Sequence, residues 1–360
     1  MEEIIRLELF SAAEVKQWLV SGISLRGLSE EVIAKQRAYA IINNPYVTDD
    51  LKIISALFVD DQVVAYTYLF PDKVRVLDEN GNPMQKLIYW NTALYCDPKY
   101  EGRGYAFCVI GQFCELYGDD YFDLDAAPAS IENLKYAGLH VEFLKQYQLS
   151  RKSIGNAGLK STLARIKEKC ELSLFSNKRS LIKQISTTKY SLEYGDFIDN
   201  ETYDFICKHA TNDLFLRSQE MLNWILTYPF MKSCPVLSRV DRENVFSSNR
   251  KFFAFYGVRV LVNNQLVGFY IYSDSEEVWY LNYLYYDTNY KKELYYSIAE
   301  HVIQSDRAKF HTSDEKFWTF LSSYKLYPKS YILKKSFSYP ANFTYNHQYQ
   351  IQAGDGDNIT

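Results

Sequence analysis

A short glycine-bearing turn is the place where this sequence could do chemistry. Gly102 and Gly104 lie between an apolar run, Leu87–Tyr95, that predicts a strand and a pattern, Phe107–Tyr117, that predicts a helix. A helix start leaves backbone N–H groups unpaired, and its dipole favours negative charge. Glycine also lets the backbone approach a phosphate without an intervening Cβ. The pattern predicts an anion site of phosphate type, with a purely structural turn as the alternative.

The turn resembles a loop of a known family. Its spacing, Glu101-x-x-Gly104-x-Ala106, resembles the acyl-CoA diphosphate loop of the GNAT acyltransferase superfamily, usually Gln/Arg-x-x-Gly-x-Gly/Ala. Glu101 departs from that pattern, because a carboxylate facing a diphosphate would repel it. The resemblance implies acetyl-CoA or another acyl-CoA as co-substrate. It also implies two sets of backbone groups that hold it: Leu94, Tyr95 and Cys96 along the pantetheine arm, and Gly102, Arg103, Gly104, Tyr105 and Ala106 at the diphosphate.

Acyl transfer to an amine also needs a base, and an acid for the departing thiolate. The resemblance implies that Asn133 lies near the pantetheine arm and that Tyr136 is the acid, with Tyr147 as the alternative acid. For the base we expect Asp125, at the end of a short predicted strand and facing the cleft if its side chains alternate. Three further residues remain alternatives for the base: Asp123, Tyr89 and Glu132.

The elements around the turn follow in a definite order. Residues 1–150 predict a strand, two helices, a hairpin, a strand, the glycine turn, a helix, a short strand and another helix. Ser11 and Glu14 form a capping-box pattern at the start of the first helix. This order is similar to that of the GNAT fold, which implies an α+β architecture with a mixed, mostly antiparallel twisted sheet flanked by helices. The segment 140–150 has no clear assignment.

The second half of the chain repeats the first. The predicted hairpin at residues 58–66 matches residues 261–269, and the strand ending at Asp97 matches the strand ending at Asp287. A helix, a short strand and a capped helix follow in each half. The second turn has no glycine, so we expect the first copy alone to hold acyl-CoA. The predicted division is residues 1–155 for the acyl-CoA-binding copy, 156–180 for a linker helix, 181–345 for the degenerate copy and 346–360 for a mobile tail.

Composition narrows the class of protein. The 360 residues carry a formal net charge of -4, which gives no overall excess of positive charge for nucleic acid. We see neither a signal peptide nor a membrane-length apolar run, and the six scattered cysteines lack metal-binding spacing, so we expect a cytoplasmic protein without a metal site. The oligomeric state does not follow from the sequence.

These observations favour one function and leave two alternatives. The favoured function is an acyl-CoA-dependent N-acyltransferase, most simply an acetyltransferase, acting on an amine of a small metabolite or an amino sugar. The first alternative is a non-catalytic tandem protein that binds a ligand or partner, which Glu101 and the second turn without glycine favour. The second is a FemAB-like aminoacyl transferase, which would need a basic groove for tRNA.

Overall fold

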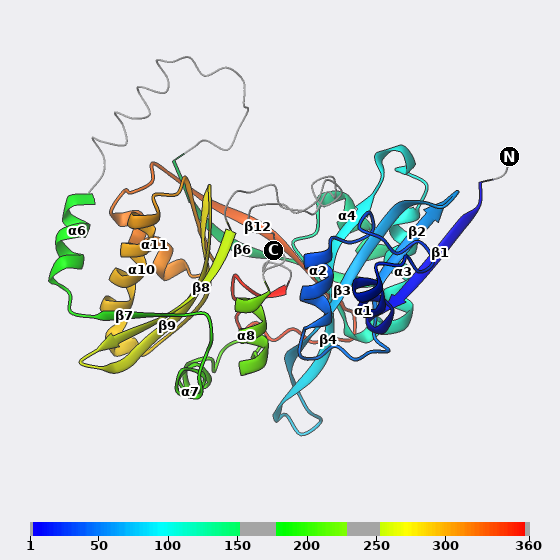
Figure 1. Cartoon of the computed structure of the whole chain (residues 1–360). Helices are drawn as coiled ribbons and strands as arrows, with labels where there is room; N and C mark the ends of the chain where they lie inside the picture. Colours follow the sequence, from blue (N-terminus) through cyan, green and yellow to red (C-terminus); the bar gives the residue numbers. More distant parts are fainter. Residues whose placement is uncertain (1–2, 152–177, 229–252, 357–360) are drawn as a thin grey trace, which may run out of the picture.

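The computed structural model describes residues 3–151, 178–228 and 253–356 of the chain. Figure 1 shows two similar halves, with the early residues on the right and the late residues on the left, joined by β6 and β12 between them. The α+β class and the tandem arrangement expected from the sequence are both confirmed. Among the described helices, none is long and apolar enough to cross a membrane.

The first copy has the expected order of elements. They are β1 Ile5–Ser11, α1 Ala12–Ser21, α2 Lys35–Ile42, β2 Lys52–Val59, β3 Gln62–Leu77, β4 Pro83–Cys96, η1 Pro98–Tyr100, α3 Tyr105–Tyr117, η2 Gly118–Asp120, β5 Tyr121–Leu124, α4 Pro128–Tyr136 and β6 Leu139–Ser150. Ser11 and Glu14 form the predicted capping box at α1. The unassigned segment 140–150 is most of strand β6.

The second copy repeats this order after the undescribed residues 152–177, which contain most of the predicted linker helix. Its elements are α6 Lys178–Thr187, β7 Ser191–Gly195, α7 Asn200–His209, α8 Gln219–Thr227, β8 Phe253–Val262, β9 Gln265–Ser275, β10 Val278–Tyr286, η3 Thr288–Tyr290, α10 Lys291–Ser305, β11 Lys309–Thr312, α11 Glu315–Ser323 and β12 Lys329–Pro340. The repeat inferred from the sequence therefore extends to the order of the strands.

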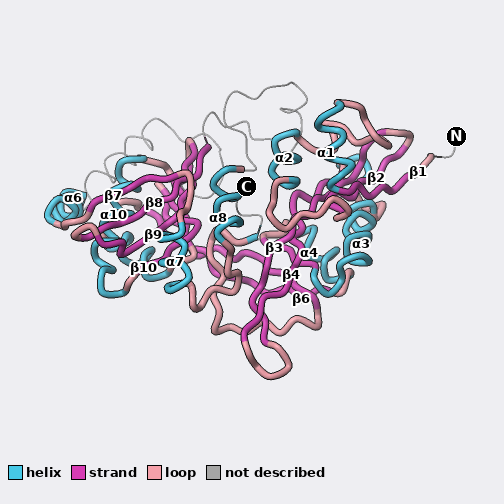
Figure 2. Tube along the Cα trace, turned by 60° about the horizontal axis from the view of Figure 1, so that its bottom comes forward, coloured by secondary structure: helices cyan, strands magenta, loops and turns pink. Residues whose placement is uncertain are grey.

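The twelve strands of the described residues form one sheet, in the order β1-β2-β3-β4-β5-β12-β6-β11-β10-β9-β8-β7, and Figure 2 shows its strands in magenta. Strand β12 of the second copy pairs with β5 of the first, and β6 of the first pairs with β11 of the second. The two copies thus exchange their last strands reciprocally, and β6 and β12 pair along their whole length. The predicted boundaries near 155 and 181 divide the sequence but not the sheet.

Helix α8 lies between the copies. Its Trp224 ring packs on Phe70 of β3, and its indole N–H donates to the carbonyl of Ala40, 2.6 Å away. Leu222 and Ile225, on the same helix, are fully buried. The largest hydrophobic core therefore contains residues of both copies, so burial in each copy depends on the other.

The structure describes residues 346–356 of the predicted mobile tail, and residues 352–356 pack inside the molecule, whereas residues 346–351 are exposed or half-buried. Gln352, Ala353 and Asp355 are all buried. The amide of Gln352 donates to Asp213 at 2.7 Å, and Asp355 accepts from the buried guanidinium of Arg217 at 3.3 Å. A polar segment packs inside the molecule here because distant polar side chains satisfy it. Residues 357–360 lie outside the described part of the chain.

Candidate functional site

The candidate site lies where strands β4 and β5 of the first copy separate. The two strands pair in parallel only from Tyr89 to Asn91 on β4, opposite 121–123 on β5. Strand β4 then continues to Cys96 with a register shift against β3, and Ala93 has a positive φ of 58°. This β-bulge turns the edge of β4 that faces away from β3, and a bulge is a common device for redirecting a strand beside an active site. The half-buried residues Leu94, Tyr95 and Cys96 lie on this stretch.

The glycine turn connects this stretch to α3. Asp97 accepts from the backbone N–H of Lys99 at 2.8 Å, which starts a short 3-10 turn. Gly102 and Gly104 both have a positive φ, 79° and 81°. A Cβ on either would meet open space within the protein, so the positive φ, rather than crowding, is what favours glycine here. Gly104 is the N-cap of α3, and no side chain caps that helix. Its first amides are therefore available to an anion, except that of Ala106, which donates to the thiol of Cys96.

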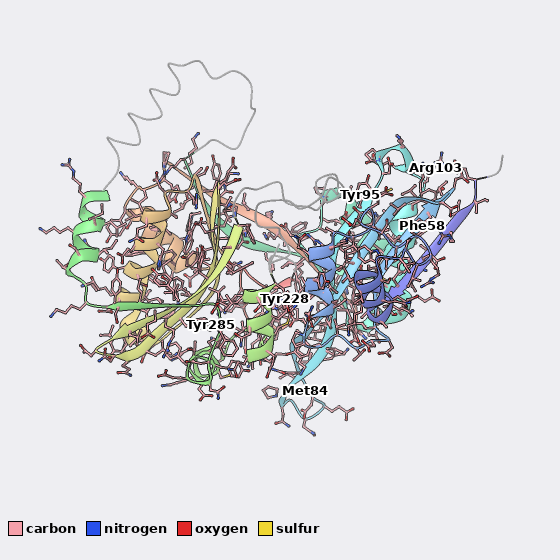
Figure 3. All side chains as sticks on the ribbon, viewed as in Figure 1. Phe58, Met84, Tyr95, Arg103, Tyr228 and Tyr285 are labelled. Atoms are coloured by element: carbon pink, nitrogen blue, oxygen red, sulfur yellow. The ribbon has the colours of Figure 1, made fainter. Side chains whose placement is uncertain are left out.

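Two contacts fix the turn. The thiol of Cys96 accepts a backbone hydrogen bond from Ala106, although burial raises the pKa of that thiol overall. Arg103 pairs with Glu3 at 2.7 Å and stacks on the ring of Tyr100. Figure 3 shows Arg103 and Tyr95 at the upper end of the first copy, away from Met84 at the tip of the β3–β4 hairpin. Because Arg103 is exposed and paired with Glu3, its positive charge would reach an anion only by leaving Glu3.

A buried polar chain crosses the strands at the point where they separate. The hydroxyl of Thr67 donates to the side-chain carbonyl of Asn91 at 2.5 Å, and the amide of Asn91 donates to Asp123 at 2.6 Å. Asp123 is 5% exposed, and burial raises its pKa to about 6. Its other oxygen, Oδ1, is buried and has no hydrogen-bond partner among the described residues. A buried carboxylate that is held by one oxygen and free at the other, with a pKa near 6, is suited to accept a proton.

The other predicted catalytic residues have surroundings different from those of Asp123. Asp125 has a positive φ of 65° at the end of β5, is half exposed and forms an ion pair with Lys335 of β12 at 3.1 Å. Tyr136 is in the last turn of α4 and is 82% exposed. Asn133 is half-buried on the same helix. Tyr147, the alternative acid, lies on β6 and packs on Trp318 in the second copy.

Of the remaining alternatives for the base, Tyr89 packs on Tyr117 of α3, and burial raises its pKa. Glu132 is exposed and pairs with Lys135 at 2.8 Å. The sequence named Asp123 only as an alternative and missed Thr67 and Asn91. The signal available there was a polar residue within each apolar strand, which alone does not reveal that the side chains meet.

Two cavities flank the first copy. One, of about 440 Å³, is lined by the end of α1, the segment leading to α2 and the β2–β3 turn. Glu30, Glu31 and Asp61 line this cavity together with Lys35, which pairs with Glu30 at 2.8 Å. Arg6 of β1 pairs with Asp61, and Glu3, two residues before the start of β1, pairs with Arg103, so the cavity and the glycine turn flank the same end of β1. The other cavity, about 890 Å³, lies between the β3–β4 hairpin and residues 342–349.

The corresponding turn of the second copy lacks the anion-site geometry. Asp287 caps the 3-10 turn through the N–H of Asn289 at 2.9 Å, as Asp97 does in the first copy. No glycine follows, and Tyr290 takes the N-cap position of α10. Among the residues that the structure describes, no group of three or more metal-ligating side chains gathers in either copy.

Comparison with solved structures identifies this architecture. A conserved protein of unknown function from Enterococcus faecalis V583, described as a probable N-acyltransferase, superposes with a TM-score of 0.51 at 9% identity, covering 94% of this chain and 72% of that one. The chain shares the fold of this protein, and its two copies have the α+β element order expected for a tandem GNAT-like fold. At this identity the similarity concerns the fold alone. No protein-family model and no curated protein sequence matches the chain.

Two further GNAT structures are similar over most of the chain, with lower scores. A GCN5-related N-acetyltransferase from Anabaena variabilis ATCC 29413 has a TM-score of 0.49 at 12% identity, covering 94% of this chain and 73% of that one. A tandem GNAT protein from the clavulanic acid biosynthesis pathway has a TM-score of 0.45 at 12% identity, covering 95% of this chain and all of that one.

Proposed function

We propose that the chain is an acyl-CoA-dependent N-acyltransferase whose first copy is the active one. The observation that carries this proposal is the uncapped start of α3 at Gly104, beside the bulged edge of β4. Of the backbone amides from Gly102 to Ala106, those of Gly102, Gly104 and Tyr105 would hold the diphosphate, because the N–H of Arg103 donates to Tyr100 and that of Ala106 to Cys96. The edge from Leu94 to Cys96 would pair with the pantetheine arm. A bound acyl-CoA supplies an activated thioester. The residues of the chain then have to position it, take a proton from the amine and return one to the thiolate.

We favour Asp123 over Asp125 as the base. Asp123 has a raised pKa and one unpartnered oxygen, whereas Asp125 is half exposed and pairs with Lys335. Asn91 holds Oδ2 of Asp123, so Oδ1 is the atom that would accept the proton, directly or through a water molecule. Tyr136 remains the proposed acid for the thiolate, and Asn133 the proposed neighbour of the pantetheine arm.

The acceptor that we propose is a small primary amine, such as an amino sugar or another small metabolite. The 440 Å³ cavity is lined by the carboxylates of Glu30, Glu31 and Asp61 and by one lysine, Lys35, which pairs with Glu30, so its lining carries a net negative charge that favours a cationic ligand. That cavity lies beside the same end of β1 as the glycine turn. We further propose a cytoplasmic enzyme that uses neither nucleic acid nor a membrane as partner.

The first test is calorimetric titration of the full chain with acetyl-CoA. We expect one site per chain, and we expect Gly104→Val to lose it because a branched side chain disfavours the positive φ at this position. Gly111→Ala, on the same helix with open space around its Cα, is the matched control and should bind like the wild type. Absence of binding by the wild-type chain would reject the enzyme and favour a non-catalytic binding protein.

A further inference from the structure

The two copies can be aligned residue by residue at the strand before the turn. The N–H of Asp97 donates to the carbonyl of Val64 at 2.8 Å, and the N–H of Asp287 donates to that of Val267 at 3.0 Å. Counting back from these equivalent aspartates, Leu284 corresponds to Leu94. Both strands also shift register against the preceding strand, between Thr92 and Tyr95 on β4 and between Leu281 and Tyr283 on β10. The edge of β10 around Leu284 is therefore the counterpart of the proposed acyl-CoA edge.

In the second copy, the end of the chain covers this edge. The N–H of Leu284 donates to the side-chain carbonyl of Gln352 at 2.9 Å, and the carbonyl of Asn282 accepts from the N–H of Gly354 at 2.9 Å. The hydroxyl of Tyr283 donates to the carbonyl of Gly354 at 2.5 Å. Strand β11 pairs with β10 only as far as Leu281, so the tail begins where that pairing ends. Both backbone groups that an extended ligand would use are thus already satisfied.

The fit of the tail is close. A Cβ on Gly354 would lie 2.7 Å from the Cζ atom of Tyr283 and 3.0 Å from the Cβ of Asn282, so any larger residue would push the tail out of the groove. Asp355 anchors the tail to Arg217, which also pairs with Asp72 of the first copy at 3.0 Å. All three charged groups are buried. In Figure 1 the last described residues, coloured red, accordingly lie between the two copies.

We infer that residues 352–355 are a built-in occupant of the groove at β10, and that they close the second copy to any extended amide-bearing ligand. The inference concerns the second copy only. It deepens the proposed function, because it gives a structural reason, besides the missing glycines, for a single acyl-CoA site per chain.

Amide hydrogen exchange of the full chain, without acyl-CoA, tests this occupancy. In Gly354→Ala the N–H of Leu284 should exchange at least about fivefold faster, as expected for the loss of one hydrogen bond. The N–H of Asp287, the residue after β10, donates to Val267 of β9 and should exchange at an unchanged rate. Gly111→Ala is the matched control for the added methyl group.

A second pair of variants separates occupancy from packing. Gln352→Leu removes the acceptor of the Leu284 N–H and should also speed its exchange, whereas Gln348→Leu, at an exposed position of the same segment, should not. A synthetic peptide with the sequence of residues 350–360 should slow the exchange again when added to Gly354→Ala. Unchanged exchange at Leu284 in both variants, or equal increases at Leu284 and Asp287, would overturn the inference. Because no acyl-CoA is present, failure here is distinguishable from failure of the proposed function.

Discussion

Replacing Asp123 with asparagine should separate function from stability. The carboxylate is buried, and burial raises its pKa from 3.8 to about 6. A group whose folded-state pKa is raised favours the fold at low pH, and that contribution is lost as the pH rises from about 4 through 6. Above that range the fold must carry an ionised carboxylate that it disfavours. The substituted amide would be neutral at every pH and could still accept the hydrogen bond from Asn91.

The magnitude follows from the pKa difference. From 3.8 to about 6 is a shift of about two units, which corresponds to about 3 kcal/mol of the free energy of unfolding at pH 8. At pH 5 only about half of this difference is expressed. A protonated aspartate and an asparagine can both present a polar hydrogen at the unpartnered position, so below pH 4 the two chains should be similar. Asp123→Asn should therefore become more stable than the wild type as the pH rises.

Urea unfolding at pH 5, 6.5 and 8 measures the stability of both chains. Asp119→Asn, an exposed aspartate just before β5, is the matched control for the change in charge and should shift the free energy of unfolding by less than about 0.5 kcal/mol. With an amine acceptor, the wild-type rate should fall below about pH 6, and Asp123→Asn should lose about 10²-fold or more of the rate. If the free energies of unfolding of the wild type and Asp123→Asn differ by the same amount at all three pH values, the pKa of Asp123 is not raised. If Asp123→Asn keeps the wild-type rate, Asp123 is not the base.

Three further predictions concern the buried charges, the acid and the exchanged strands. Arg217→Met should lower the free energy of unfolding, measured in urea, by about 3–5 kcal/mol, because it leaves the buried carboxylates of Asp72 and Asp355 without their cation. A loss below about 1 kcal/mol would show that the two carboxylates are not ionised together. Tyr136→Phe should lower kcat about 10²-fold with little change in the KM for acyl-CoA, and an unchanged kcat would remove Tyr136 from the mechanism. Calorimetric unfolding should give one transition for both copies, since each contains a strand of the other; two resolved transitions would contradict the shared sheet.

Local signals explain the parts of the fold that the sequence predicted. Gly102 and Gly104 mark a turn because few other residues adopt a positive φ there. The hairpin at 58–66 and its counterpart at 261–269 each place a two-residue polar turn, Asp60-Asp61 and Asn263-Asn264, between two apolar runs, so the repeat is visible without any tertiary contact. Ser11 and Glu14 identify the start of α1 by a contact within one helical turn.

Long-range contacts explain what the sequence did not predict. Strand β6 pairs with two strands of the second copy, and no pattern within residues 139–150 specifies these partners. The tail is polar and glycine-bearing, which is typical of a mobile end. Residues 352–356 are instead buried because Arg217 and Leu284, far away in sequence, supply their partners. The link from Asn91 to Asp123 likewise depends on two strands that are separated by α3.

The strand exchange gives the second copy a part in the proposed site even though its own groove is closed. On β12, Ser338 lies directly opposite Asp123, and Phe337 lies opposite Leu124. The hydroxyl oxygen of Ser338, like Oδ1 of Asp123, is buried without a hydrogen-bond partner among the described residues. Lys335 of the same strand pairs with Asp125. The strand beside the proposed base, β12, therefore comes from the second copy. A chain without this copy would lose part of the burial that raises the pKa of Asp123.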